Sequence, residues 1–142
     1  MSWLPRKTVV TPIDFQDESF EACDLALELA ADPASVHVVH VLPRLSPMEP
    51  GVTWGELTDD VRTEKTEQAI RDRLSDARYA QVQIHVAVGS AAKEITKHAE
   101  HVDADLIVLP SHGRTGGARL LLGSVAEHVA RLAHCPVLIL RS

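Results

Sequence analysis

The strongest constraint on the fold is a regular alternation of short apolar runs with segments of helical periodicity. The apolar runs occupy residues 8–13, 36–42, 82–88, 106–109 and 137–140. They are short and rich in Val, Ile and Leu, which is typical of strands in a buried sheet. After the first run, apolar residues recur at helical spacing from Phe20 to Ala30, and Pro33 ends the pattern.

Three later segments also have helical character. The first runs from about residue 54 to 77, with an inward face of Leu57, Val61, Ile70, Leu74 and Ala77. The second follows Gly89–Ser90, a turn and N-cap signal, and the third begins near Ser124. Strands that alternate with helices predict an α/β fold, in which parallel strands are joined by right-handed crossovers and helices cover both sheet faces.

Length and composition limit the classes of protein that fit. The chain of 142 residues suits a single domain over 1–142, and its net charge of −6 argues against binding to nucleic acid or an anionic membrane. It shows no secretory signal and no apolar run near the roughly 20 residues that span a bilayer, so we expect a cytoplasmic protein. Its two cysteines, Cys23 and Cys135, are predicted to be buried, reduced thiols.

A glycine-rich segment follows the fourth apolar run. Ligands of open parallel sheets bind outside the carboxyl ends of the strands, which directs attention to Asp14, Val41 and the residues after Leu109. There the chain carries four glycines and then Ser124 at the start of a helix, where free N–H groups attract an anion. Residues 110–142 also hold four arginines against one glutamate. The spacing Ser124-x-x-Glu127 equally fits a capping box, so phosphate binding and a plain helix start both remain open.

Several ordered segments then point to one family. They are 10–15, 40–41, 89–95, 104–108, Ser111-His112-Gly113-Arg114-Thr115-Gly116, Leu121-Leu122-Gly123-Ser124-Val125-Ala126-Glu127 and Cys135-Pro136-Val137-Leu138-Ile139. Together they resemble the universal stress protein family over nearly the whole chain. The resemblance implies an open five-stranded parallel sheet of order 3-2-1-4-5, a Rossmann-like fold of the adenine nucleotide alpha hydrolase-like type.

The resemblance also implies a set of binding residues for ATP, with Mg²⁺ as its companion ion. The family's ATP-binding branch has Gly-x2-Gly-x9-Gly-Ser/Thr, which this chain matches at Gly113, Gly123 and Ser124, with Pro110 in place of the first glycine. Proline has no backbone N–H and cannot adopt a positive φ, so any ribose contact that needs either one is lost. The implied binding residues are Pro12, Ile13, Asp14, Val41, Pro110, Ser111, His112, Gly113, Arg114, Gly123, Ser124 and Val125.

Within that set, the resemblance places Pro12 and Ile13 around the base, Asp14 beside the adenosine and Val41 along the adenine edge. Strand-end packing for the first two, and capping of the first helix by Asp14, are the alternatives.

Three functions follow, together with an expected homodimer through the last strand, Val137, Leu138, Ile139 and Leu140. The first is a regulatory stress protein that binds ATP. The second is a stress protein that acts only through dimerisation and partners, for which Pro110 is the best argument. The third is a weak ATPase, although no base with an orienting carboxylate is evident and we assign no catalytic residue. Of eight histidines, His98 and His101 share a helical face but lack a third ligand, so we expect no metal site.

Overall fold

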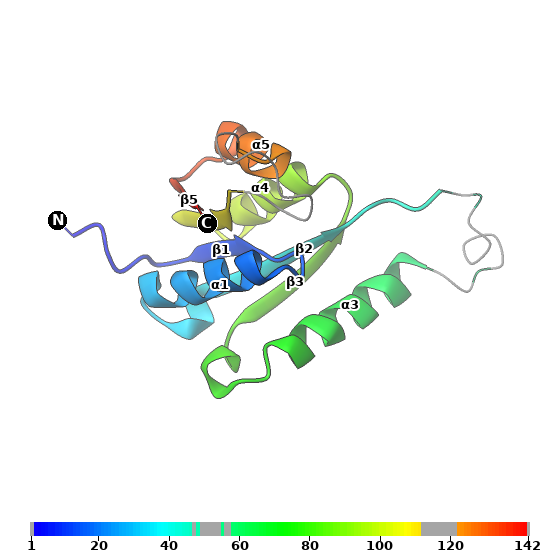
Figure 1. Ribbon diagram of the computed structural model, residues 1–142, viewed down its shortest axis with the longest axis horizontal. Helices are drawn as coiled ribbons and strands as arrows, with labels where there is room; N and C mark the ends of the chain where they lie inside the picture. The colour runs from blue at the N-terminus through cyan, green and yellow to red at the C-terminus, as the bar shows by residue number, and fades with distance from the viewer. Residues whose placement is uncertain (1, 47, 49–54, 56–57, 112–121, 142) are drawn as a thin grey trace.

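The structure is a computed structural model that describes residues 2–46, 48, 55, 58–111 and 122–141. Its strands are β1 (Val9–Pro12), β2 (Val36–Leu42), β3 (Gln83–Val88), β4 (Leu106–Pro110) and β5 (Val137–Leu140). Its helices are α1 (Asp17–Leu29), α3 (Asp59–Arg73), α4 (Ala91–His101) and α5 (Ser124–Leu132), with short 3₁₀ turns η1 (Pro33–Ser35) and η2 (Ala77–Tyr79). Strands and helices alternate along the chain (Figure 1), as the sequence predicts.

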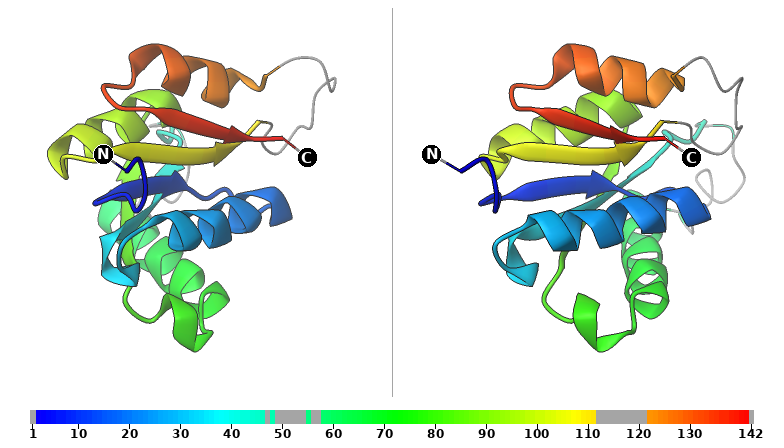
Figure 2. Two further views of the ribbon diagram at one scale, coloured as in Figure 1. Left: turned by 90° about the vertical axis from the view of Figure 1, so that its left-hand side faces the viewer. Right: turned by 60° about the vertical axis from the view of Figure 1, so that its left-hand side comes forward.

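All strands are parallel and form one sheet in the order β3-β2-β1-β4-β5, which confirms the predicted topology. Val10 of β1 pairs with His37 of β2 on one side and with Ile107 of β4 on the other. The helices α1 and α3 lie on one face of the sheet, and α4 and α5 lie on the opposite face (Figures 1 and 2).

The central strands are buried on both faces because successive side chains point to opposite sides. Val9 and Val36 contribute to the core under α1 and α3, whereas Val10 and Val39 contribute to the core under α4 and α5. Residues 106–109 of β4 are all at most 1% exposed. This double burial explains why β1 and β4 have nearly continuous apolar sequences.

Polar side chains define several helix ends. The Thr58 hydroxyl accepts a hydrogen bond from the Val61 N–H and begins α3, and Gly89 with φ of +151° precedes α4. Ser90 occupies the predicted N-cap position of α4, although its hydroxyl makes no capping hydrogen bond in the described chain.

The predicted end of the second helix is wrong. Helix α3 ends at Arg73, and Ala77 is exposed in η2 rather than on an inward face. The Asp76 carboxylate accepts from the Arg78 N–H and starts this separate turn. The predicted start near Trp54 and the inward Leu57 lie outside the described residues.

Both cysteines are free thiols, as predicted. Cys23 of α1 is fully buried in the core between this helix and the sheet. Burial, and then the charge of Asp24, raise its pKa to about 12. Cys135 is half-buried rather than buried. Within residues 2–46, 58–111 and 122–141, none of the helices combines the length and apolar character that crossing a bilayer requires.

Candidate functional site

The carboxyl ends of β1, β2 and β4 meet at one edge of the sheet. Pro12, the last residue of β1, pairs with Val39, and the Ile13 N–H continues the ladder by donating to the Val39 carbonyl at 2.8 Å. The chain after β1 therefore runs beside the end of β2, where Val41 is half-buried. This edge brings together the predicted base-side residues.

The two apolar residues at the end of β1 have different surroundings. Ile13 is only 3% exposed and packs in the core on the α1 side, whereas Pro12 is half-buried. The Ile13 side chain thus supports the edge from within the core. The half-buried Pro12 and Val41 are the residues of this group that retain surface for a ligand.

Asp14 organises the turn between β1 and α1. Its carboxylate accepts a hydrogen bond from the Gln16 N–H at 3.0 Å, and its own N–H donates to the Ser19 hydroxyl. Ser19 in turn donates to the Gln16 carbonyl at 2.8 Å. The N-cap of α1 is Gln16, so Asp14 does not cap the helix but forms the turn that precedes it.

Two further residues at this edge, Phe15 and His40, were not predicted as site residues from the sequence. Phe15 has φ of +67°, an uncommon conformation for a bulky residue, and its ring lies 5.2 Å from the His40 ring in an edge-to-face arrangement. A hydrogen bond joins His40 Nδ1 to the Ile13 carbonyl. His40 therefore holds the β1–α1 turn against β2, and only the cross-strand register reveals this contact.

The phosphate side of the predicted site is formed by the end of β4 and the start of α5. Ser111 is 4% exposed, and its N–H donates to the Leu140 carbonyl at 2.9 Å. Its carbonyl accepts from the Gly123 N–H at 2.7 Å, which seats the start of α5 beside the end of β4. Pro110 is the last residue of β4 and pairs with Leu140.

The start of α5 differs from the capping-box alternative. Gly123 is the N-cap, Ser124 is the first helical residue, and no side chain in the described chain caps this end. Because the helix starts one residue earlier than a Ser124 cap requires, Glu127 is not at the N3 position of a capping box and instead pairs with Arg131. The first-turn N–H groups beside the exposed Ser124 and Val125 have no intrahelical partner and point outward from a positive dipole end.

The structure thus gathers Pro12, Ile13, Asp14, Val41, Pro110, Ser111, Gly123, Ser124 and Val125 at or near the carboxyl edge of the sheet. The predicted residues His112, Gly113 and Arg114 lie outside the described residues.

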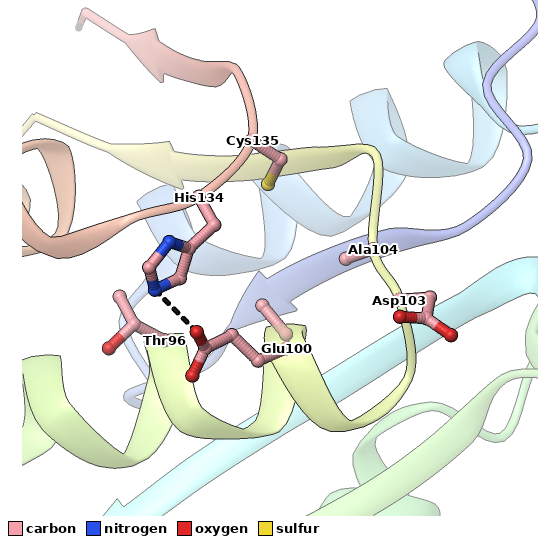
Figure 3. Close-up of a pocket in the computed structure, with 7 residues that line it drawn as sticks. Thr96, Glu100, Asp103, Ala104, His134 and Cys135 are labelled. Carbon is pink, nitrogen blue, oxygen red and sulfur yellow. Dashed lines mark ion pairs between the residues drawn. The ribbon is translucent and has the colours of Figure 1, made fainter.

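A cavity of about 360 Å³ lies elsewhere, between the end of α4 and the segment that joins α5 to β5 (Figure 3). None of the predicted site residues lines it; its lining is Thr96, Ala99, Glu100, Asp103, Ala104, His134 and Cys135. Glu100 and His134 form an ion pair across it, and burial raises the pKa of Cys135, which disfavours a reactive thiolate. No group of three His, Cys, Asp or Glu side chains in the described parts of the chain is arranged to hold a metal ion.

The fold and the residues at the carboxyl edge of the sheet define a class of protein. It is that of the Rossmann-like α/β proteins with an open parallel sheet of order 3-2-1-4-5. A model of the universal stress protein family matches residues 5–141. The chain is 38% identical over 141 residues to universal stress protein MJ0531 of Methanocaldococcus jannaschii, a match that covers 95% of this chain and 82% of that protein. The chain therefore belongs to the universal stress protein family.

Two solved structures are similar over nearly their full length. That of MJ0577, also from M. jannaschii, has a TM-score of 0.73 at 28% identity, and the match covers 98% of each chain. A universal stress protein in complex with cAMP has a TM-score of 0.69 at 25% identity, with 96% of this chain and 98% of that chain covered.

Proposed function

We propose that this protein is a regulatory stress-response domain that binds an adenine nucleotide, ATP with Mg²⁺, at the carboxyl edge of its sheet. The observation that carries the proposal is the start of α5. Gly123 and Ser124 present a helix N-terminus that no described side chain caps, beside the end of β4 and at the same edge as Asp14 and Val41. Helix N-termini in this setting favour phosphate groups.

The residues at the base end of the proposed site support the same ligand. Pro12 and Val41 are half-buried apolar residues, and His40 holds the turn that carries Asp14. An apolar slot with a few polar groups is the usual surrounding of a purine. The complex of a related universal stress protein with cAMP adds support for an adenine nucleotide.

The residue roles follow from these positions. Pro12 and Val41 would contact the base, and Ile13 would support them from the core. Asp14 and Pro110 would lie on the ribose side. The segment from Ser111 to Arg114 would bind the phosphates together with Gly123, Ser124 and Val125. The N–H that Pro110 lacks weakens the ribose contact without touching the helix N-terminus.

We further propose that residues 1–142 act as one domain in the cytoplasm, where free thiols such as Cys23 and Cys135 persist.

We propose a homodimer joined through β5. This strand is at the sheet edge, and Leu138 on it is 36% exposed, with Val125 and Leu132 of the adjacent helix at 38% and 44%. Exposed apolar edges favour pairing with a second copy.

Calorimetric titration with ATP and Mg²⁺ tests the nucleotide proposal. We expect the native protein to bind with micromolar to sub-millimolar affinity and Gly123→Val to bind at least about tenfold more weakly, since the new side chain stands at the phosphate end. Gly123 has an extended backbone (φ −64°, ψ 158°) that Val also adopts, so the fold should be retained. Ala130→Val, which adds the same side chain to an exposed position of α5, is the matched control.

The outcomes separate the three functions. Absence of binding heat for the native protein would overturn the nucleotide proposal. It would favour a dimer that acts through partners, the function for which Pro110 is the best argument. Binding accompanied by steady phosphate release that Ser124→Ala abolishes would instead favour a slow ATPase.

A further inference from the structure

Four histidines from three elements gather beneath the last turns of α4. His37 lies on β2, His85 on β3, and His98 and His101 on α4. The His98 ring is the centre of this histidine cluster: it stacks on His85 with ring centroids 4.1 Å apart and an interplanar angle of 6°. His37 lies 5.8 Å away and His101 6.3 Å away by the same measure.

The sheet register places the two strand histidines on the same face. His85 pairs with Val39, which is two residues after His37 and therefore points to the same side. Val39 belongs to the core under α4 and α5, so both imidazoles face α4. Helix α4 packs on this face of the sheet, and its His98 ring lies near both imidazoles.

Among the described residues, the interior of the cluster has no partner for a positive charge. His98 Nε2 is buried and makes no hydrogen bond within the described chain. Burial, and then the neighbouring His85, His37 and His101, lower the pKa of His98 to about 4. Burial also lowers the pKa of His37.

Two carboxylates act on His85, the member of the cluster that lies on the edge strand β3. Burial lowers the pKa of His85, and the charge of His101 lowers it further. The charges of Glu94 of α4 and Glu67 of α3 act in the opposite direction and raise it. Neither carboxylate compensates His98 at the centre. The near-parallel His85 and His98 rings also do not converge as metal ligands, in agreement with the lack of a three-ligand group among the described side chains.

We propose that the histidine cluster is a pH-sensitive contact that docks α4 on β2 and β3 near neutral pH and weakens this docking in acid. Neutral imidazoles stack and pack well, whereas protonation places a buried charge among other basic groups. This inference does not depend on nucleotide binding.

The direction of the effect follows from the proton linkage. The folded-state pKa of His98 lies below the ordinary value of 6.5, so the unfolded chain takes up the proton first. The stabilisation is therefore complete above about pH 6.5 and is lost progressively as the pH falls toward about 4. Helix α4 also packs on α5, so loosening it removes support from the helix that begins at Ser124.

Urea unfolding of the native protein and of His98→Gln, followed by circular dichroism between pH 7 and pH 5 with EDTA present, tests the proposal. We expect the unfolding constant of the native protein to rise roughly tenfold more than that of His98→Gln over this range, a value reduced for partial exposure of the ring. His128→Gln, an exposed histidine of α5 outside the cluster, is the control and should follow the native protein.

NMR titration of the histidine rings in the native protein keeps the proposal falsifiable if His98→Gln does not fold. We expect one ring of the cluster, that of His98, to titrate far below 6.5. Equal pH dependence of the native protein and His98→Gln would overturn the proposal, as would a cluster whose four rings all titrate at or above 6.5.

Discussion

Replacing Thr11 by Val should stabilise this protein. Thr11 lies in the central strand β1 and is completely buried, yet its hydroxyl makes no hydrogen bond within the described residues. A buried hydroxyl without a partner bears a desolvation penalty of about 1–3 kcal/mol, which the nearly isosteric Val removes. We take about 1.5 kcal/mol as the expected gain in the free energy of unfolding, with a further small gain from the higher strand propensity of Val.

The same number gives the expected change in melting temperature. About 2.1 cal/mol/K per residue over 142 residues gives an unfolding entropy of about 300 cal/mol/K. A gain of about 1.5 kcal/mol then raises the Tm by about 5 °C. Urea unfolding with an unchanged m-value, together with scanning calorimetry, measures both quantities.

Thr96→Val is the matched control for this prediction. Thr96 is also buried, at 8% exposure, but its hydroxyl donates to the Ala92 carbonyl at 2.9 Å. The same chemical change there removes a satisfied hydrogen bond and should lower stability by about 0.5–1 kcal/mol. A Thr11→Val variant that is no more stable than the native protein, or that changes in the same direction as Thr96→Val, would show that the buried Thr11 hydroxyl carries no such penalty.

Two further substitutions test contacts near the sheet ends. Burial raises the pKa of Asp105, but hydrogen bonds from the Lys7 and Thr8 N–H groups and the charge of Arg6 outweigh it, so the net pKa lies below 3.8. Asp105→Asn should therefore lower the unfolding free energy by about 1–2 kcal/mol at pH 7, and this difference should shrink as the pH falls below about 4; an equal difference at pH 7 and pH 3.5 in urea would contradict it. His40→Ala should lower stability by about 2 kcal/mol through the lost Ile13 hydrogen bond and Phe15 contact and should weaken ATP binding, whereas unchanged calorimetric affinity would remove His40 from the site.

The alternation of apolar runs and helical segments was sufficient to predict the parallel α/β class, and family resemblance supplied the strand order. β2 and β5 have the predicted bounds because Pro43 and Pro136 flank apolar runs with few alternatives. The end of α3 was not predictable, because Ala77 is a good helix former and the turn signal lies in the side chain of Asp76. Tertiary context overrides propensity at such boundaries.

The candidate site, like the fold, was predictable from the sequence only in part. Asp14 and Ser124 could be proposed from their positions along the chain, because the ends of parallel strands meet at one edge. The His40–Ile13 hydrogen bond and the histidine cluster join residues from different elements, so they depend on register and on how α4 crosses the sheet. Periodicity within a single segment does not contain that information.

Binding of an adenine nucleotide at the carboxyl edge of the sheet can be observed residue by residue in an amide NMR titration with ATP and Mg²⁺. We expect the signals of Asp14, Val41, Ser124 and Val125 to shift together with increasing ATP. Cys135, in the cavity of Figure 3, should stay unchanged and serves as the internal control. Absence of any shift at millimolar ATP, or shifts confined to that cavity, would contradict nucleotide binding at the carboxyl edge.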